Sequence, residues 1–376
     1  MKPHRDFIWR LQRVAVVTSA TAMLTAALTM TSIVRPDASD LSCPSGSGAE
    51  IIPVADCLGH DATALPPRPR AVIYSGAAFG FSGPSGLAAD QSHLWVSNIL
   101  GNSVTELNTG NGSRTATLLS SYGFDGPHAL AMGSGQLWIA NVQANSVIEL
   151  DAATGELIRT LSGSAYGFDD PYALALAGHD LWVANARAGS VTEIDTPSGT
   201  LVRTLSAARY RFDEPYAIAA SGSRVWVANA ANPSVTELSA ANGRLIRVVS
   251  GPRYGFADPV AITVDGTRAW VANQGGDSIT EINARTGAWI STLSGHSYGF
   301  ADPSAVLADS AQLWVASAAG DSVTEINPQT GAAAILSGRR YGFSGPAALD
   351  SSGNGVWVAN LSSNTVTELL PGKPAG

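Results

Sequence analysis

The chain has 376 residues, 14% of them charged, and a formal net charge of −8 at pH 7. Residues 71–376 are slightly more acidic, with 15 Lys and Arg against 24 Asp and Glu once the 7 basic and 6 acidic residues of 1–70 are set aside. This balance argues against nucleic acid as a partner, because phosphates require a basic surface. It favours a small cationic ligand, a metal ion or a basic protein segment.

The N-terminal segment has the pattern of an export signal. Residues 14–34 carry no charge, follow four basic residues and precede Arg35. Their length suits a membrane span or a long signal peptide. Because no Ala-x-Ala motif ends the stretch, we expect residues 1–35 to be a signal anchor with a membrane helix at 14–34; a cleaved signal peptide is the alternative. The basic flank predicts an exported remainder, membrane-anchored or secreted.

Residues 36–70 are rich in Pro, Ser and Gly, a composition typical of a linker. The two cysteines of the chain, Cys43 and Cys57, both lie in this segment. In an exported protein we expect them to form a disulfide. With His60 as the nearest histidine, they are too few for a metal site.

The rest of the chain is a repeat. A tryptophan recurs every 43 or 44 residues in the same short phrase, at Trp95, Trp138, Trp182, Trp226, Trp270, Trp314 and Trp357. Helical repeats also have periods near this length, but each unit here contains several Gly, at least one Pro and only short apolar runs rich in Val, Ile, Thr and aromatics. The composition therefore predicts strands.

Four strands fit in each unit, and we name them a to d. In the second unit they are His128–Met132, Gln136–Asn141, Ser146–Asp151 and Glu156–Ser162, and short turns with Asx and Gly join them. The last unit stops after its c strand, whereas residues 71–76 (AVIYSG) align with the d strands. We therefore expect residues 71–376 to form an all-β, seven-bladed propeller, monomeric, of four-stranded antiparallel blades closed by residues 71–76.

Most repeated residues are expected to be structural. The Trp of each b strand and the Phe of each Gly-Phe pair should pack between blades. The Glu of each SVTE phrase, such as Glu193 or Glu237, is expected to face solvent or an Arg of the adjacent d strand, such as Arg203 or Arg247. The Asn that ends most b strands should satisfy the loop that follows.

One position varies where its neighbours repeat. The residue after the Pro of each d–a loop begins the innermost strand at the mouth of the central channel, and it is Ser85, His128, Tyr172, Tyr216, Val260, Ser304 and Ala347 in turn. Variable residues on a rigid scaffold are where binding residues collect. We therefore expect Ser85, His128, Tyr172, Tyr216 and Ser304 to bind a ligand.

Acidic residues stand just before this Pro, and Asp170, Glu214, Asp258 and Asp302 are candidate ligand-binding residues for a cationic group or a protein partner. The alternative is that each acid caps its own turn.

The units resemble the NHL/YVTN group of β-propellers, including the streptogramin (virginiamycin B) lyase branch. The resemblance covers about 300 residues and rests on phrases such as PYALALAGHDLWVAN (Pro171–Asn185) followed by SVTEIDTPSG (Ser190–Gly199). It implies a propeller fold. The lyase branch implies a His base, acidic partners and a divalent metal ion on the mouth face. His128 is suitably placed for such a base, whereas His296 follows an outermost strand.

Two hypotheses follow. The favoured one is an exported, membrane-tethered propeller that binds a ligand or protein on its acidic mouth face, without catalysis or cofactor. The alternative is a metal-assisted lyase or hydrolase that uses His128 and nearby carboxylates. They differ in whether carboxylates converge on His128 within metal-bonding distance.

Overall fold

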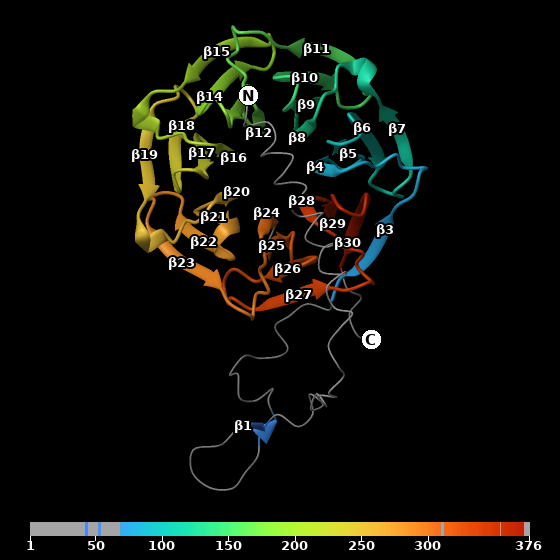
Figure 1. Ribbon diagram of the computed structural model, residues 1–376, viewed down its shortest axis with the longest axis vertical. Coiled ribbons are helices and arrows are strands. Elements are labelled where there is room, and N and C mark those ends of the chain that lie inside the picture. The colour runs from blue at the N-terminus through green and yellow to red at the C-terminus, as the bar shows by residue number, and fades with distance from the viewer. Residues whose placement is uncertain (1–41, 44–51, 54–67, 310–311, 354, 372–376) are drawn as a thin grey trace, which may run out of the picture.

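The computed structural model describes residues 42–43, 52–53, 68–309, 312–353 and 355–371. Seven four-stranded antiparallel sheets are arranged as blades in a ring around a central axis, with the first strand of each blade innermost (Figure 1). This is the predicted seven-bladed propeller. The prediction of a helix at 14–34 and a disulfide to Cys57 concerns residues outside those described.

The blades follow the chain order, and their strands match the predicted units closely. Blade 1 holds β4 (Pro84–Ala89), β5 (His93–Asn98), β6 (Ser103–Asn108) and β7 (Arg114–Leu118); blade 2 holds β8 (Pro127–Gly133), β9 (Gln136–Asn141), β10 (Ser146–Asp151) and β11 (Leu157–Leu161); blade 3 holds β12 (Pro171–Ala177), β13 (Asp180–Asn185), β14 (Ser190–Asp195) and β15 (Thr200–Leu205). Blade 4 holds β16 (Pro215–Ser221), β17 (Arg224–Asn229), β18 (Ser234–Ser239) and β19 (Leu245–Ser250); blade 5 holds β20 (Pro259–Asp265), β21 (Arg268–Asn273), β22 (Ser278–Asn283) and β23 (Trp289–Ser294). Blade 6 holds β24 (Pro303–Asp309), β25 (Gln312–Ser317), β26 (Ser322–Ile326) and β27 (Ala333–Ser337); blade 7 holds β28 (Pro346–Ser352), β29 (Gly355–Asn360) and β30 (Thr365–Leu370).

The fourth strand of blade 7 comes from the start of the propeller. β3 (Arg70–Tyr74) pairs antiparallel with β30, with Val72 opposite Glu368 and Tyr74 opposite Val366. Compared with the expected segment 71–76, β3 begins one residue earlier, at Arg70, and ends two residues earlier, at Tyr74. It covers the outer edge of β30, which would otherwise be open to pairing.

Short 3₁₀ helices occupy some connections, at η2 (Ser120–Tyr122), η3 (Ala208–Tyr210), η4 (Pro252–Tyr254) and η5 (Gln274–Gly276). Within the expected linker, β1 (Ser42–Cys43) and β2 (Ile52–Pro53) pair as a two-stranded sheet.

The repeated tryptophans are buried between blades. Trp138 forms one apolar cluster with Leu181 and Val183 of the next blade and with Phe168 of the connecting loop. Equivalent clusters join other neighbours, and Trp357 and Leu94 share the one that joins the last blade to the first. The prediction that Trp and Phe form the packing frame is confirmed.

The repeated glutamates correct one expectation. They do not face solvent: Glu149 and Glu237 are fully buried, and Glu193 is 2% exposed. The expected Arg partners are present, with Arg203 Nε 2.8 Å from Glu193 and Arg247 Nε 2.7 Å from Glu237. Both faces of a middle strand are covered by neighbouring blades, so strand alternation does not send one face to water.

Candidate functional site

A β-bulge at the start of each innermost strand builds the site. In blade 3 the pairing register shifts between Pro171 and Ala173, so Tyr172 has no residue opposite it on β13. The other six innermost strands shift in register at the same Pro. Bulges redirect side chains next to functional sites. Here they place the variable residue of every blade at the channel mouth.

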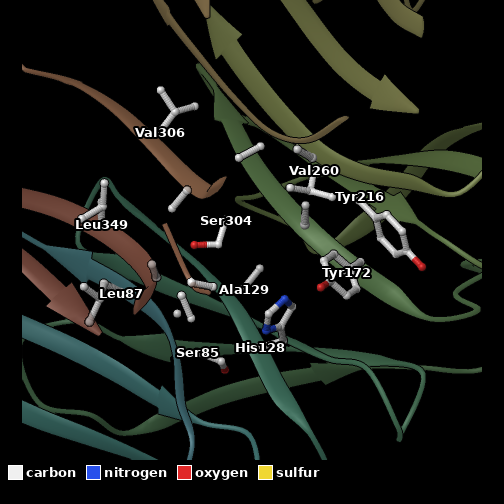
Figure 2. Close-up of a pocket in the computed structure, with 18 of the residues that line it drawn as sticks. Ser85, Leu87, His128, Ala129, Tyr172, Tyr216, Val260, Ser304, Val306 and Leu349 are labelled. Atoms are coloured by element: carbon white, nitrogen blue, oxygen red, sulfur yellow. The ribbon is translucent and has the colours of Figure 1, made fainter. Parts of the chain in front are cut away.

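The seven variable residues line one cavity of about 380 Å³ at the centre of the ring (Figure 2). Most of the remaining wall consists of small and aliphatic residues of the same strands, such as Ala129, Ile218 and Leu349. Ser85, His128, Tyr172, Tyr216 and Ser304 are thus brought together, as expected for a shared site. The cavity is within the size range of small-molecule sites, and its wall is mostly apolar, as is usual for them.

Three aromatic rings form a row along this wall. The ring centroids of His128 and Tyr172 are 4.4 Å apart with the planes at 61°, and those of Tyr172 and Tyr216 are 4.7 Å apart at 57°. Each ring comes from a different blade, on β8, β12 or β16, and Figure 2 shows the three side chains beside one another at the cavity. Edge-to-face and tilted contacts of this kind contribute about 0.5–1.5 kcal/mol each beyond area burial. The row is therefore a preformed aromatic surface.

His128 is neutral at physiological pH. Burial lowers the pKa of its imidazole from 6.5 to about 4, because the charged form loses hydration. A base with so low a pKa is poorly matched to proton abstraction near pH 7. Its neutral ring is suited instead to stacking and hydrogen bonding.

The two serines differ in how much of their hydrogen-bonding capacity is used. Ser304 Oγ donates to the carbonyl of Pro346 in the next blade at 2.6 Å. Ser85 Oγ lies 3.4 Å from Ser97 Oγ, whose hydroxyl donates to the His128 carbonyl at 2.6 Å. The serine hydroxyls therefore fix neighbouring blades to each other, while the lone pairs of Ser304 stay available to a ligand.

The four acidic candidates do not line the cavity. Each precedes its Pro with a left-handed backbone, at φ values of 62°, 48°, 54° and 51° for Asp170, Glu214, Asp258 and Asp302. Glycine fills the same position in the other three blades, as Gly83, Gly126 and Gly345, also with positive φ. Asp tolerates this conformation better than most residues. The left-handed backbone therefore explains why Asp occurs at this position, although Glu214 is unusual there. A role of these acids in ligand binding stays a prediction.

The donors needed for a metal ion do not come together in the described part of the chain. No group of three or more His, Cys, Asp or Glu residues there could hold one. Asp302 has neighbours of like charge, since burial first and then Asp277 and Asp258 raise the pKa of its carboxyl. This carboxylate group does not include His128, so the residues present do not fit the metal site that the lyase branch implies.

Some cavity residues were not singled out in the sequence. Gln274, Ala318 and Leu361 reach it from the b–c loops, each directly after the last residue of its b strand. These loops vary among blades, which is the signal that could have identified them. Gln274 supplies the only side-chain amide among the described lining residues.

Comparison with known proteins shows the fold. No protein-family model matches the sequence, and no curated protein sequence matches it. Virginiamycin B lyase from Staphylococcus aureus superposes with a TM-score of 0.67 at 16% identity, over 80% of this chain and 99% of that one. A streptogramin B lyase structure gives 0.65 at 18% identity, over 80% and 98%, and the WD40 repeats of RRP9 give 0.65 at 13%, over 82% and 99%. The likeness is one of fold. It confirms that the chain resembles the propellers of the lyase branch in fold.

Among the described residues, no helix is long and apolar enough to cross a membrane.

Proposed function

We propose that the chain is an exported, membrane-tethered propeller that binds a small organic ligand at its channel mouth without catalysing a reaction on it. The observation that carries this proposal is the row of His128, Tyr172 and Tyr216 along a mostly apolar wall. Flat rings held by a rigid frame bind flat or aliphatic groups at little conformational cost. Export is proposed from the basic flank and uncharged stretch of residues 1–35.

The ligand class follows from the ring row and the overall charge. Tyrosine rings attract cations through their π faces, and residues 71–376 carry more acidic than basic side chains. With His128 neutral, no described lining residue adds a positive charge. We therefore propose an aromatic or aliphatic ammonium compound rather than an acid. A basic protein segment is the alternative source of the same chemistry, and known propellers of this fold include components of protein complexes.

The metal-assisted lyase or hydrolase is the weaker proposal. His128 is present at the channel mouth, but its pKa of about 4 and the missing cluster of metal donors among the described residues both count against it.

The test uses phenethylammonium and its neutral analogue phenethyl alcohol as probes, observed by NMR titration and thermal shift on the wild-type chain. At a hundredfold excess over Kd, a ligand stabilises the folded state by about 2.7 kcal/mol. We expect the ammonium compound to bind more tightly, and Tyr172→Ala to weaken binding at least roughly tenfold.

Tyr122→Ala is the matched control, because Tyr122 stacks on Phe124 at 5.8 Å and does not line the cavity. Equal binding by the wild type and Tyr172→Ala, or no saturable binding of either probe, would contradict the proposal.

A further inference from the structure

In several blades, the buried glutamate of the c strand has an arginine partner. In blade 5, Arg268 Nη1 donates to Glu281 Oε1 at 2.9 Å and to the Pro328 carbonyl in the c–d turn of blade 6 at 2.9 Å. In blade 4, Arg224 donates in the same way to Glu237 and to the carbonyl of Ala284 in blade 5, the latter at 3.2 Å. An arginine at the start of the b strand thus spans two blades.

Blade 7 has Gly355 at this position. Among the described residues, this position opens on a cavity of about 510 Å³ between blades 7 and 1, lined by Gly355, Glu368 and Tyr74 on one side and by residues 109–111 on the other. A Cβ built on Gly355 would lie 3.3 Å from Glu368 Oε1, so the side chain that is missing would point at that carboxylate. Glu368 is 9% exposed, and its Oε2 accepts a hydrogen bond of 2.8 Å from the Tyr74 hydroxyl.

The opposite wall matches the arginine sites of blades 4 and 5. Thr109 aligns with Ala284 and Pro328, whose carbonyls accept from Arg224 and Arg268. The turn has the same hydrogen bonds as its counterpart in blade 5: Gly112 N to Asn108 O at 2.7 Å and Asn108 N to Ser113 O at 2.8 Å, against 2.8 Å for both equivalents. The carbonyl of Thr109 therefore has the orientation of one that binds a guanidinium elsewhere in the molecule.

We propose that this cavity is a binding site for a guanidinium group, supplied by a small guanidine or by an arginine side chain of a peptide. Glu368 Oε1 and the carbonyls of the 109–111 turn accept its N–H groups, while Tyr74 holds the other carboxylate oxygen in place. A planar donor fork matches such acceptors better than an ammonium group does.

Arg70 is the internal competitor. It lies in the lining, is exposed, and acts on Glu368 through its charge, lowering a carboxyl pKa that burial raises more strongly. Removing this charge should strengthen cation binding. Binding should weaken as the pH falls through the pKa of Glu368, because the protonated carboxyl has no charge to attract the ligand.

The test is calorimetric and NMR titration of the wild-type chain with ethylguanidinium, with propylammonium as the comparison cation. We expect one saturable ethylguanidinium site that is lost in Gly355→Arg, where the new side chain fills the cavity. Gly355 is the first residue of the extended strand β29, and extended backbone accepts this change. Glu368→Gln should weaken binding at least roughly tenfold, and Arg70→Gln should strengthen it.

Arg268→Gly is the matched positive variant, because it should open a second copy of the site in blade 5 and raise the stoichiometry from one to two. A wild-type chain that shows no saturable binding, or binding that Gly355→Arg leaves unchanged, would overturn the proposal. Circular dichroism and melting curves establish that each variant is folded.

A blocked Ala-Arg-Ala tripeptide and its citrulline counterpart distinguish the source. If ethylguanidinium and the arginine peptide bind but the citrulline peptide does not, the site is assigned to a partner's arginine side chain. If ethylguanidinium binds and neither peptide does, it is assigned to a free guanidine. Equal affinity for propylammonium and ethylguanidinium would overturn the choice of guanidinium. Phenethylammonium binding at the channel mouth should persist in Gly355→Arg, so the two proposed sites can fail independently.

Discussion

The side chain of Asn364 in the last blade accepts a hydrogen bond of 2.7 Å from the amide of Gly83 in the first, and so joins the two ends of the ring. The same bond recurs at four other joints. In each, the side-chain oxygen of the last residue of a b–c loop accepts from the backbone N–H of the residue before the next Pro: Asn102 from Gly126, Asn145 from Asp170, Asp277 from Asp302, and Asp321 from Gly345. Both acceptor and donor residues have positive φ. Gly189 and Pro233, at the joints on either side of blade 4, have no side chain that could make it.

Replacing Asn364 should therefore loosen the closure. We expect Asn364→Ala to lower the free energy of unfolding by about 1–3 kcal/mol, because it removes the acceptor and places Ala in a left-handed conformation. Urea titration measures this. Asn364→Gly adopts the left-handed backbone without strain, so its effect measures the loss of the hydrogen bond alone. Asn364→Asp restores the acceptor that Asp277 and Asp321 supply elsewhere. Equal stability of the Ala and Asp variants would contradict the assignment.

The closing strand gives a second prediction. A chain that begins at Gly76 lacks β3, which exposes the edge of β30 and removes Tyr74 from the cluster that contains Trp357. We expect a fall of about 3 kcal/mol or more in unfolding free energy and a tendency to aggregate. Differential scanning calorimetry and light scattering measure both effects. A chain that begins at Arg68 is the control, and an unchanged melting temperature in the shorter chain would refute the role of β3.

The sequence predicted the blade number, the strand boundaries and the variable position at the channel mouth, because each depends on a period that recurs seven times. It did not predict the bulge after each Pro, since nothing in Pro171-Tyr172-Ala173 distinguishes a bulged start from a regular one. The contacts among His128, Tyr172 and Tyr216 depend on the radius of the channel, which no local pattern encodes. Burial of Glu193 was missed because alternation along a strand does not reveal that both of its faces are covered.

His128 makes stability depend on pH. Its folded pKa of about 4 lies below the ordinary value of 6.5, so the unfolded chain binds the proton more readily. Protonation of His128 therefore does not affect stability above pH 7. Stability decreases as the pH falls from 6.5 towards 4 and is then constant, and the total loss is at most about 3 kcal/mol. The difference in urea stability between the wild type and His128→Gln, measured from pH 4 to 8, should change with this sign. A difference independent of pH would show that the imidazole is not desolvated.

Glu325 should have the opposite pH dependence. It is 5% exposed, and burial raises its pKa from 4.5 to about 7. Ala334 stands opposite it on β27, where Arg203 and Arg247 stand opposite Glu193 and Glu237. A raised folded pKa means that the folded chain holds the proton more tightly, so stability is lost as the pH rises from 4.5 through 7.

We therefore expect Glu325→Gln to stabilise the chain by about 2 kcal/mol at pH 8, where the wild type must keep a buried carboxylate ionised, and to have little effect at pH 4. Glu237→Gln is the contrasting variant. Burial raises the pKa of Glu237 as well, but Arg247 and Arg224 oppose this shift, and neutralisation leaves two cations without their carboxylate. It should destabilise at pH 8. Urea denaturation at the two pH values measures both variants, and the same sign for both at pH 8 would show that the cation pairing of these glutamates does not determine their contribution.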